Sequence, residues 1–301
     1  WEHAWGVRLS PDPGLSPARL IHEAEQGNLK ALYVMGANPF RSFPQPGRVR
    51  EAFKGLNLLV VQDILETETA AEADVVLPGA AFAEKEGAFV NLEARVQAFS
   101  PAVPPPGEAR PDWRILADLH DGLSASPGRY GGIADIRGEI RSLVPGYGGV
   151  SFQPGEGETP RFRETPPGHP GEVPAYGLPE PVPDLEADPE HPFWAVLEFP
   201  RCHMGSGTRT SRSMRARFLE PENGLEMDRA DAERIGLEPG DRVRVASRWG
   251  AVERTVEISP RVRAGLVGVA AGVRGNDAME LMPLEDGGQP PGTCRVRIDK
   301  R

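Results

Sequence analysis

The strongest constraint on the fold is a series of short apolar segments that alternate with helical patterns in the first eighty residues. The apolar segments predict buried strands at residues 29–36, 57–63 and 74–78, and the intervening patterns predict helices at 47–56 and 67–73. Continuous apolar strands joined by helices are typical of a parallel sheet covered on both faces. The first part of the chain is therefore predicted to be an α/β domain with a parallel sheet.

The later part of the chain changes character twice. Residues 148–192 are rich in Pro, Gly and Glu and have almost no apolar periodicity, so this segment is predicted to be a linker or an extended arm. Beyond it, short alternating strands such as 241–259 predict a small β-barrel. We expect an α/β domain at 1–147, the arm at 148–192 and the barrel domain at 193–301.

Composition excludes several classes of protein. The net charge of −10 and the pI of about 5.2 argue against a nucleic-acid partner, because a phosphate-binding surface needs a basic excess. Cys202 and Cys294 are the only cysteines, and neither belongs to a CxxC pair. They exclude a cysteine-ligated zinc or iron–sulfur site built by this chain alone and favour two buried thiols of a cytosolic protein over a disulfide.

The ends of the chain also lead to expectations. No apolar run approaches the roughly 18–20 residues of a membrane span, and no signal peptide is visible. The first residue is Trp1 rather than Met. We therefore expect the chain to be part of a longer protein or a processed product.

Polar and small residues follow the predicted strands at the ends where ligands bind in an open parallel sheet. Gly36 and Asn38 follow the first strand, and Gln62 and Asp63 follow the second. Asp63 is placed to accept two hydrogen bonds from a guanine edge or a ribose diol. The alternative is that Asp63 caps the helix at 67–73. The residues alone leave both roles open, and the absence of GxGxxG and P-loop motifs gives no support to an ordinary NAD or ATP site.

Two polar clusters lie outside these strand ends. The segment 84–97 carries Lys85 and Arg95 around an apolar centre, and it is either a solvated charged face or a partly buried loop that meets an anion. The segment 201–217 places five arginines among Gly, Ser and Thr. Backbone amides and guanidinium groups suit a diphosphate, although a flexible basic loop has the same composition. His203 is expected to be structural, because no catalytic triad surrounds it.

Five ordered blocks of the sequence resemble the C-terminal half of the molybdopterin oxidoreductase family. They are "MGANP", "VVQDILETETAAEADVVLP", "AEKEGAFVNLEARVQ", "PPPGEARPDWRILADL" and "HMGSGTRTSRS". The resemblance is strongest to formate dehydrogenase alpha subunits and to the large iron–sulfur subunit of bacterial NADH–quinone oxidoreductase. It implies a parallel Rossmann-like α/β domain followed by a six-stranded β-barrel of the double-psi type.

The resemblance implies a cofactor and a set of contacts. The cofactor is molybdopterin guanine dinucleotide with Mo or W, and a guanine nucleotide at the second strand end favours the contact role of Asp63 over the capping role. Asp112, which is also expected to cap a helix at 112–120, is compatible with both functions. The residues that match cofactor contacts in the family are Gly36, Asn38, Gln62, Asp63, Lys85, Asp112, Arg201, His203, Ser206 and Asn276.

The resemblance also implies that the catalytic groups of the family lie outside this chain. The metal ligand and the iron–sulfur cysteines belong to an N-terminal half, so no catalytic or metal-binding residue is assigned here and the chain alone is expected to be inactive. The chain departs from the family at Ala94, where Gly or Arg is usual, and near Gly292, where a lysine is usual. The missing lysine weakens the pterin site and favours the alternative, an NADH–quinone oxidoreductase subunit with an empty pterin site. The retained "GSGTRTSRS" and "QD" favour the expected function, a formate-dehydrogenase-like oxidoreductase whose guanine dinucleotide is held by this chain.

The expected partners follow from the same resemblance. They are the N-terminal catalytic half or other subunits of an oxidoreductase complex, together with a small-molecule substrate such as formate. We expect a cytoplasmic protein without a membrane span. If it belongs to a membrane-bound complex, we expect it on the cytoplasmic side of that complex.

Overall fold

The protein divides into two units by its internal contacts. The computed structural model describes residues 1–301 except 125–127, 153–187, 201–202, 220–223, 274–275 and 285–291. The first unit comprises Trp1–Gly14 and Leu77–Val182, and the second comprises Leu15–Val76 and Pro183–Arg301. The domain boundaries expected at 147/148 and 192/193 remain predictions, and most of the expected arm lies outside the described residues.

A three-stranded sheet in the order β1-β2-β3 begins the second unit. Strands β1 (Ala31–Met35) and β2 (Leu58–Asp63) are parallel and in register, and β3 (Val75–Pro78) leads the chain into the first unit. All three strands were predicted from their apolar runs. The fold class, an α/β domain with a parallel sheet followed by a six-stranded barrel, is confirmed.

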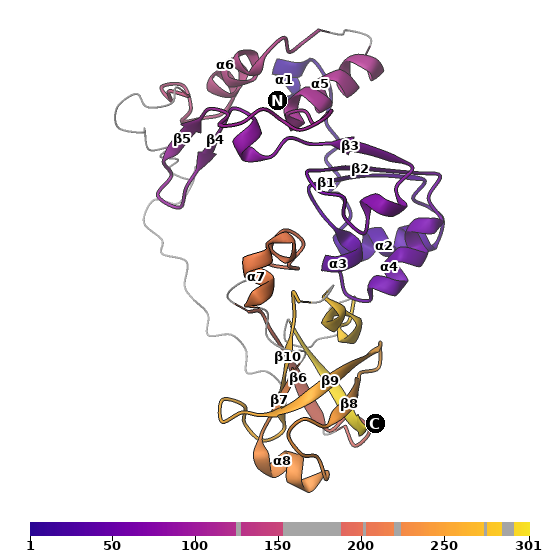
Figure 1. Ribbon diagram of the computed structural model, residues 1–301. Coiled ribbons are helices and arrows are strands. Elements are labelled where there is room, and N and C mark those ends of the chain that lie inside the picture. Colours follow the sequence, from indigo (N-terminus) through magenta and orange to yellow (C-terminus); the bar gives the residue numbers. More distant parts are fainter. Residues whose placement is uncertain (125–127, 153–187, 201–202, 220–223, 274–275, 285–291) are drawn as a thin grey trace, which may run out of the picture. The chain divides into compact units, whose positions relative to one another are not determined.

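Helices cover one face of this sheet. Figure 1 shows α2 (Pro17–Glu25) and α4 (Pro46–Lys54) on the same side of it. Their apolar residues join those of the strands in one buried cluster, which includes Ile21, Val34, Val49, Phe53, Leu59 and Val61. Side chains that alternate to the other face, Tyr33, Met35 and Leu58, are 37–46% exposed. In the described part of this unit, the sheet therefore has one covered face rather than the two expected.

The helix predicted at 67–73 is shorter than expected. Only a 3₁₀ turn, η1 (Ala70–Glu72), forms there, and the hydroxyl of Thr67 accepts a hydrogen bond from the amide of Ala70 at 3.1 Å. The chain must return to the sheet immediately, because the amide of Leu59 donates to Asp74 Oδ2 at 2.7 Å. This return leaves no room for a second helical turn.

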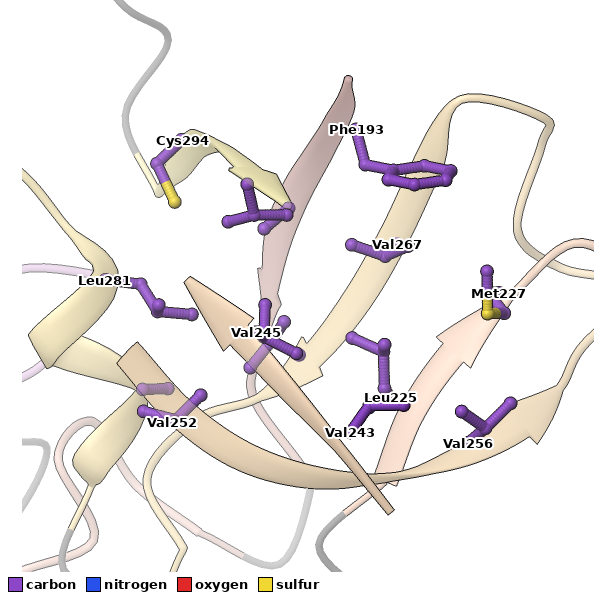
Figure 2. Close-up of a cluster of buried hydrophobic side chains, with 14 of the residues drawn as sticks. Phe193, Leu225, Met227, Val243, Val245, Val252, Val256, Val267, Leu281 and Cys294 are labelled. Carbon is purple, nitrogen blue, oxygen red and sulfur yellow. The ribbon is translucent and has the colours of Figure 1, made fainter. Parts of the chain in front are cut away.

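The C-terminal part of the second unit is a closed barrel. Its six strands run in the order β10-β6-β11-β8-β9-β7, and β7 pairs with β10 to close the ring. Alternating apolar residues point inward, and Figure 2 shows this core with labelled side chains from all six strands. The strands are β6 (Phe193–Glu198), β7 (Gly224–Met227), β8 (Arg242–Ala246), β9 (Ala251–Ile258), β10 (Leu266–Ala270) and β11 (Thr293–Lys300).

One predicted thiol lies in this core. Cys294 on β11 is fully buried and is not in a disulfide, and burial raises the pKa of its thiol to about 12. The expectation of a buried thiol is confirmed for Cys294, whereas Cys202 lies outside the described residues. Short helical elements complete the second unit: α3 (Pro39–Ser42), η3 (Thr210–Arg212), α7 (Met214–Phe218), α8 (Arg229–Arg234) and η4 (Asp277–Leu281).

The first unit is built around a β-hairpin of β4 (Gly87–Val90) and β5 (Val96–Phe99). Val96 from the hairpin is buried together with Val150 and Phe152. The other elements are α1 (Glu2–Trp5), η2 (Phe82–Glu84), α5 (Asp112–Leu123) and α6 (Ile133–Leu143). No helix among the described residues is long and apolar enough to cross a membrane.

The predicted capping role of Asp112 is wrong. Pro111 occupies the N-cap position of α5, and Asp112 is the first helical residue, with no side-chain capping bond. A carboxylate in the first turn still interacts favourably with the helix dipole. The side chain of Asp112 forms an ion pair with Lys85 instead.

Asp231 ties α8 to the start of β10, and this contact generates a stability prediction. Its carboxylate accepts hydrogen bonds from the Gly265 amide at 2.6 Å and from Arg234 at 2.7 Å. Burial opposes ionisation, but these bonds outweigh it and lower the pKa of Asp231. A lowered carboxyl pKa contributes stability that is present above the unfolded pKa and is lost as pH falls through the folded pKa.

Asp231→Asn should therefore lower the free energy of unfolding by about 1.5–3 kcal/mol at pH 7, the value typical of charged hydrogen bonds. The difference in free energy of unfolding between the variant and the wild type should shrink when urea unfolding is repeated from about pH 4 downward. Protonation of Asp231 in the wild type removes the negative charge that strengthens its hydrogen bonds. Asp299→Asn, an exposed barrel carboxylate with an exposed partner, is the matched control and should change little. An equal loss at pH 7 and at low pH would contradict the charge-based account.

Ala94 generates a second prediction. It lies in the turn between β4 and β5 with φ of +59°, a left-handed conformation that L-residues adopt at a penalty of about 1–2 kcal/mol. Ala94→Gly should thus raise the free energy of unfolding of the first unit by up to about 1 kcal/mol, since part of the relief is offset by the entropy of an unfolded glycine. Ala98→Gly in the regular strand β5 is the control, and it should be destabilising. A loss of stability in both variants would refute the strain at Ala94.

Candidate functional site

The carboxyl ends of β1 and β2 lie side by side in the second unit. The in-register pair Met35 and Gln62 ends the ladder, and the Gly36 amide donates to the Gln62 carbonyl at 2.8 Å. Gly36 has φ of +60°, and a Cβ built on it would meet no atom within 4 Å. The chain at Gly36 therefore borders open space, where a ligand can approach the backbone closely. Gln62 is fully buried and accepts a hydrogen bond from the Tyr33 hydroxyl.

Asp63 is half-buried at the end of β2, next to this open space. Its Oδ1 accepts a hydrogen bond from the Leu65 amide at 3.1 Å, which closes a local Asx turn. The capping role considered for Asp63 is not observed: its carboxylate binds the Leu65 amide, and the amide of Ala70 in the following 3₁₀ turn donates to the Thr67 hydroxyl. In the described part of the chain, Oδ2 of Asp63 accepts no hydrogen bond. This oxygen is the free acceptor of the site.

Asn38 is the centre of a hydrogen-bond network between three segments. Its Oδ1 accepts from the Thr69 hydroxyl at 2.8 Å, and its Nδ2 donates to Glu68 Oε2 at 2.6 Å and to Thr208 Oγ1 at 3.2 Å. Asn38 is buried, with 5% of its surface exposed. Its amide is therefore committed to fixing the segment after β2 and the loop 203–213, which follows β6.

Arg41 on α3 extends this network with a buried charge. Its Nε donates to the Ser206 carbonyl at 2.8 Å, and its Nη1 lies 3.3 Å from Glu68 Oε1. The Arg41 carbonyl accepts from Asn276 Nδ2 at 2.7 Å. Burial opposes the ionisation of Glu68, but hydrogen bonds from Asn38, its own amide and Arg41, together with the charge of Arg41, lower its pKa. The carboxylate of Glu68 is therefore ionised at neutral pH.

The backbone of the loop 203–213 packs directly against the backbone of Gly272. Gly207 has φ of +73°, and a Cβ there would lie 1.9 Å from the Gly272 carbonyl oxygen. A Cβ on Gly272 would lie 2.8 Å from the Gly205 carbonyl oxygen. Asn276 holds the facing turn, because its Oδ1 accepts from the Gly272 amide at 2.7 Å. The two backbones touch where any side chain would separate them.

The remaining predicted residues are distributed over both units. His203 is buried and its Nδ1 lies 2.7 Å from the Thr210 hydroxyl, while the Ser206 hydroxyl lies 2.9 Å from that of Thr208. Lys85 and Asp112 belong to the first unit, where they form an ion pair with each other. Arg201 lies outside the described residues.

Three residues of the hydrogen-bond network were not predicted from the sequence. Arg41, Glu68 and Thr208 bind Asn38, Ser206 and Asn276 into one cluster of the second unit. The signal for Arg41 was available: it is a single charge between Phe40 and Phe43 in a segment that directly follows a buried strand. Glu68 gave no such signal, because it stands among other acids in "ETETAAEAD".

The donor and acceptor set fits a nucleotide better than a metal ion. An open glycine strand end and a carboxylate with a free oxygen can face a base or a ribose, and a glycine-seated loop with arginines can face phosphates. No group of three or more metal-ligating side chains occurs among the described residues. An apolar hollow of about 350 Å³ beside the hairpin in the first unit has none of the predicted site residues in its lining.

Two family models match the chain. The molybdopterin oxidoreductase model matches residues 8–121, and the model of the molydopterin dinucleotide binding domain matches residues 200–289. The first match includes the strand ends at Gly36 and Asp63, and the second includes the loop 203–213. The residues that build the candidate site therefore fall inside the two matched regions.

Curated relatives agree with these models. The NADPH-Fe(3+) oxidoreductase subunit alpha of Geobacter sulfurreducens is 34% identical over 97% of this chain, which covers 33% of that protein. The F420-dependent formate dehydrogenase 1 subunit alpha of Methanococcus maripaludis is 35% identical over 89% of this chain and 42% of its own length. Formate dehydrogenase H of Escherichia coli is 28% identical over 88% of this chain and 39% of its own length. The chain thus spans between a third and about two-fifths of these relatives.

A solved structure shares the fold. Acetylene hydratase from Pelobacter acetylenicus superimposes with a TM-score of 0.62 over 95% of this chain and 46% of its own, at 15% sequence identity. At that identity the likeness concerns the fold alone. The two family models and the formate dehydrogenase relatives agree with one another: the chain belongs to the molybdopterin oxidoreductase family, and its regions 8–121 and 200–289 match the oxidoreductase and dinucleotide-binding models.

Proposed function

We propose that this chain holds the guanine nucleotide end of a molybdopterin guanine dinucleotide in a formate-dehydrogenase-like oxidoreductase. The observation that carries the proposal is Asp63, a half-buried carboxylate at a strand end whose Oδ2 has no partner among the described residues. A carboxylate accepts two N–H bonds from a guanine edge or two O–H bonds from a ribose diol. Gly36 at the neighbouring strand end leaves space for either group.

The phosphates are assigned to the loop 203–213 of the same unit. Its backbone turns through Gly205 and Gly207 with positive φ, and its Ser206 and Thr208 hydroxyls lie within hydrogen-bond distance of each other. Arg209 and Arg212 supply positive charge in this segment. Oriented amides and fixed arginines lower the free energy of a bound diphosphate.

The other predicted contacts keep their roles as proposals. Asn38, Gln62 and Asn276 shape the second unit around the nucleotide, and His203 supports the loop through Thr210. Lys85, Asp112 and Arg201 remain proposed cofactor contacts by resemblance. Lys85 and Asp112 neutralise each other as the structure stands, so a cofactor phosphate at Lys85 would have to compete with that ion pair.

The reaction is proposed to be the two-electron oxidation of a small substrate, formate in the first instance. The cofactor, when bound, supplies the redox chemistry with Mo or W, and this chain's residues bind and orient its nucleotide. The metal ligand, the iron–sulfur clusters and the partner subunits are assigned to parts of the relatives beyond the matched third to two-fifths. The alternative, the large iron–sulfur subunit of NADH–quinone oxidoreductase with an empty pterin site, predicts the same fold without bound nucleotide.

The test uses the full-length protein that contains this chain. Asp63→Asn keeps an acceptor for the Leu65 amide and removes the charge, so it should weaken nucleotide binding without breaking the local turn. Charged hydrogen bonds are worth about 1.5–3 kcal/mol, which corresponds to roughly a 10–100-fold loss of affinity. We expect less GMP after acid hydrolysis and less Mo or W per mole of protein, together with lower formate-dependent dye reduction.

Glu66→Gln is the matched control, because Glu66 is an exposed acid three residues away in the same segment. It should retain wild-type GMP and metal content. Equal GMP in the Asp63→Asn variant and the wild type would restrict Asp63 to its Asx turn. Absence of GMP and metal from the wild-type protein, purified from a host that makes the cofactor, would favour the empty-site alternative.

A further inference from the structure

Among the described residues, Arg41 and Arg254 are buried arginines that each keep one nitrogen without a hydrogen-bond partner, and Arg41 is the one that contacts the loop 203–213. Its side chain is only 8% exposed, and its Nη2 atom is buried without a hydrogen-bond partner among the described residues. A buried donor without a partner costs about 1–3 kcal/mol. An apolar side chain of similar length would avoid this penalty, and replacing a buried ion pair by apolar residues is often neutral or stabilising. Stability alone therefore gives no reason for an arginine here.

The contacts of Arg41 point to a role in position rather than in stability. Its Nε donates to the Ser206 carbonyl at 2.8 Å, and its Nη1 pairs with Glu68 at 3.3 Å. Its Nη2 lies beside Gly207, since a Cβ on that glycine would be 3.2 Å away. A planar guanidinium with two engaged edges determines both the distance and the orientation of its partners. The 206–207 backbone is thereby fixed relative to the segment after β2.

The main chain of Arg41 is also held in place by a hydrogen bond. Asn276 donates from Nδ2 to the Arg41 carbonyl at 2.7 Å and accepts from the Gly272 amide at 2.7 Å. Gly272 in turn forms the backbone seat on which Gly207 rests. Arg41 therefore contacts both sides of this seat, one through its guanidinium and one through its carbonyl.

We propose that Arg41 is a positioning residue that holds the 205–208 backbone against α3 and the segment after β2, so that the loop is in place before a nucleotide binds. The inference rests on the proposed function, because it assigns the held loop to the nucleotide phosphates. Arg41 itself acts through Ser206 and Glu68. Preorganisation of this kind removes the entropy that ordering the loop would consume on binding.

The loop carries its own reporter of position. Arg209 and Arg212 are trypsin sites a few residues beyond the contact to Ser206. A held loop is cleaved slowly, because cleavage follows the population of opened molecules when opening and closing are fast. The rate of tryptic cleavage after Arg209 and Arg212 in the full-length protein thus measures how firmly the loop is held, with or without cofactor.

Arg41→Met should accelerate this cleavage at least about tenfold. The charged bond to Ser206 is lost, and a change of about 1.4 kcal/mol corresponds to a factor of ten. Arg41→Lys should not restore slow cleavage, because an ammonium cannot reproduce the Nε and Nη1 geometry. Arg297→Met is the matched control, since Arg297 is a half-exposed arginine on the barrel that pairs with Asp299 at 3.2 Å in the same unit. It should leave the cleavage rate unchanged.

A double-mutant cycle tests whether Arg41 and Glu68 act together. Glu68→Gln should accelerate cleavage, and the double variant Arg41→Met with Glu68→Gln should be no faster than Arg41→Met alone. Strictly multiplicative effects of the two substitutions would overturn the claim that the pair acts as one unit. Should Arg41→Met fail to fold, Thr208→Val is the second variant, since it removes the Asn38 contact at 3.2 Å with little change in shape. It should also accelerate cleavage.

The outcomes separate this inference from the proposed function. Faster cleavage in Arg41→Met with lower GMP content and an unchanged midpoint of thermal unfolding supports a positioning role. Unchanged cleavage overturns it, and faster cleavage with full GMP content overturns the link between the held loop and the nucleotide. If Asp63→Asn also keeps its GMP, Asp63 is restricted to its Asx turn, and absence of GMP from the wild-type protein contradicts the proposed function, whatever the cleavage rate of the loop.

Discussion

The arrangement of the loop 203–213 in the second unit depends on one buried cation, Arg41. The guanidinium of Arg41 holds the Ser206 carbonyl and the Glu68 carboxylate, and its own carbonyl receives the Asn276 amide. These groups come from segments separated by up to 235 residues in the chain. Apart from Nη2 of Arg41, the buried side-chain nitrogen and oxygen atoms of this network have partners, and a buried polar group that loses its partner is costly away from water. The network therefore tolerates few arrangements of the loop, the strand ends and the turn at Gly272.

The barrel and the sheet contribute rigidity of different kinds. In the barrel, closure of six strands leaves no free edge, and the alternating valines fill the interior. In the sheet, two helices cover one face, and the strand ends remain accessible at Gly36. A rigid frame with an accessible edge is suited to a ligand that is bound by backbone and by a few polar side chains. The proposed nucleotide site uses this combination.

Membership of the molybdopterin oxidoreductase family gives the site its chemical context. The chain spans a third to about two-fifths of its curated relatives, so the larger part of such an enzyme lies outside the matched region. Under the proposed function, the residues described here would bind and orient the nucleotide, and the groups that exchange electrons would belong to other parts of the enzyme. This division is consistent with a chain of only two cysteines, one of them a buried thiol with a raised pKa.

The sequence by itself determined the regular elements, because apolar periodicity reflects burial directly. It predicted β1, β2 and the two barrel strands within 241–259, and it placed Asp63 at a strand end, whereas no local pattern marked β6 or β7. It failed where a local pattern competed with tertiary contacts. The alanine-rich segment after β2 forms a single 3₁₀ turn because Asp74 returns the chain to Leu59, and Asp112 pairs with Lys85 rather than capping α5.

Only the tertiary structure decided which polar groups meet. Arg41 and Glu68 are 27 residues apart, and Arg41 and Ser206 are 165 apart, so no local spacing rule relates them. Their pairing follows from the packing of the loop's glycine backbone on the Gly272 turn, a steric condition that appears only after folding. Strands and helices are thus readable from periodicity, whereas a buried charge network is decided by the geometry that brings distant segments into contact.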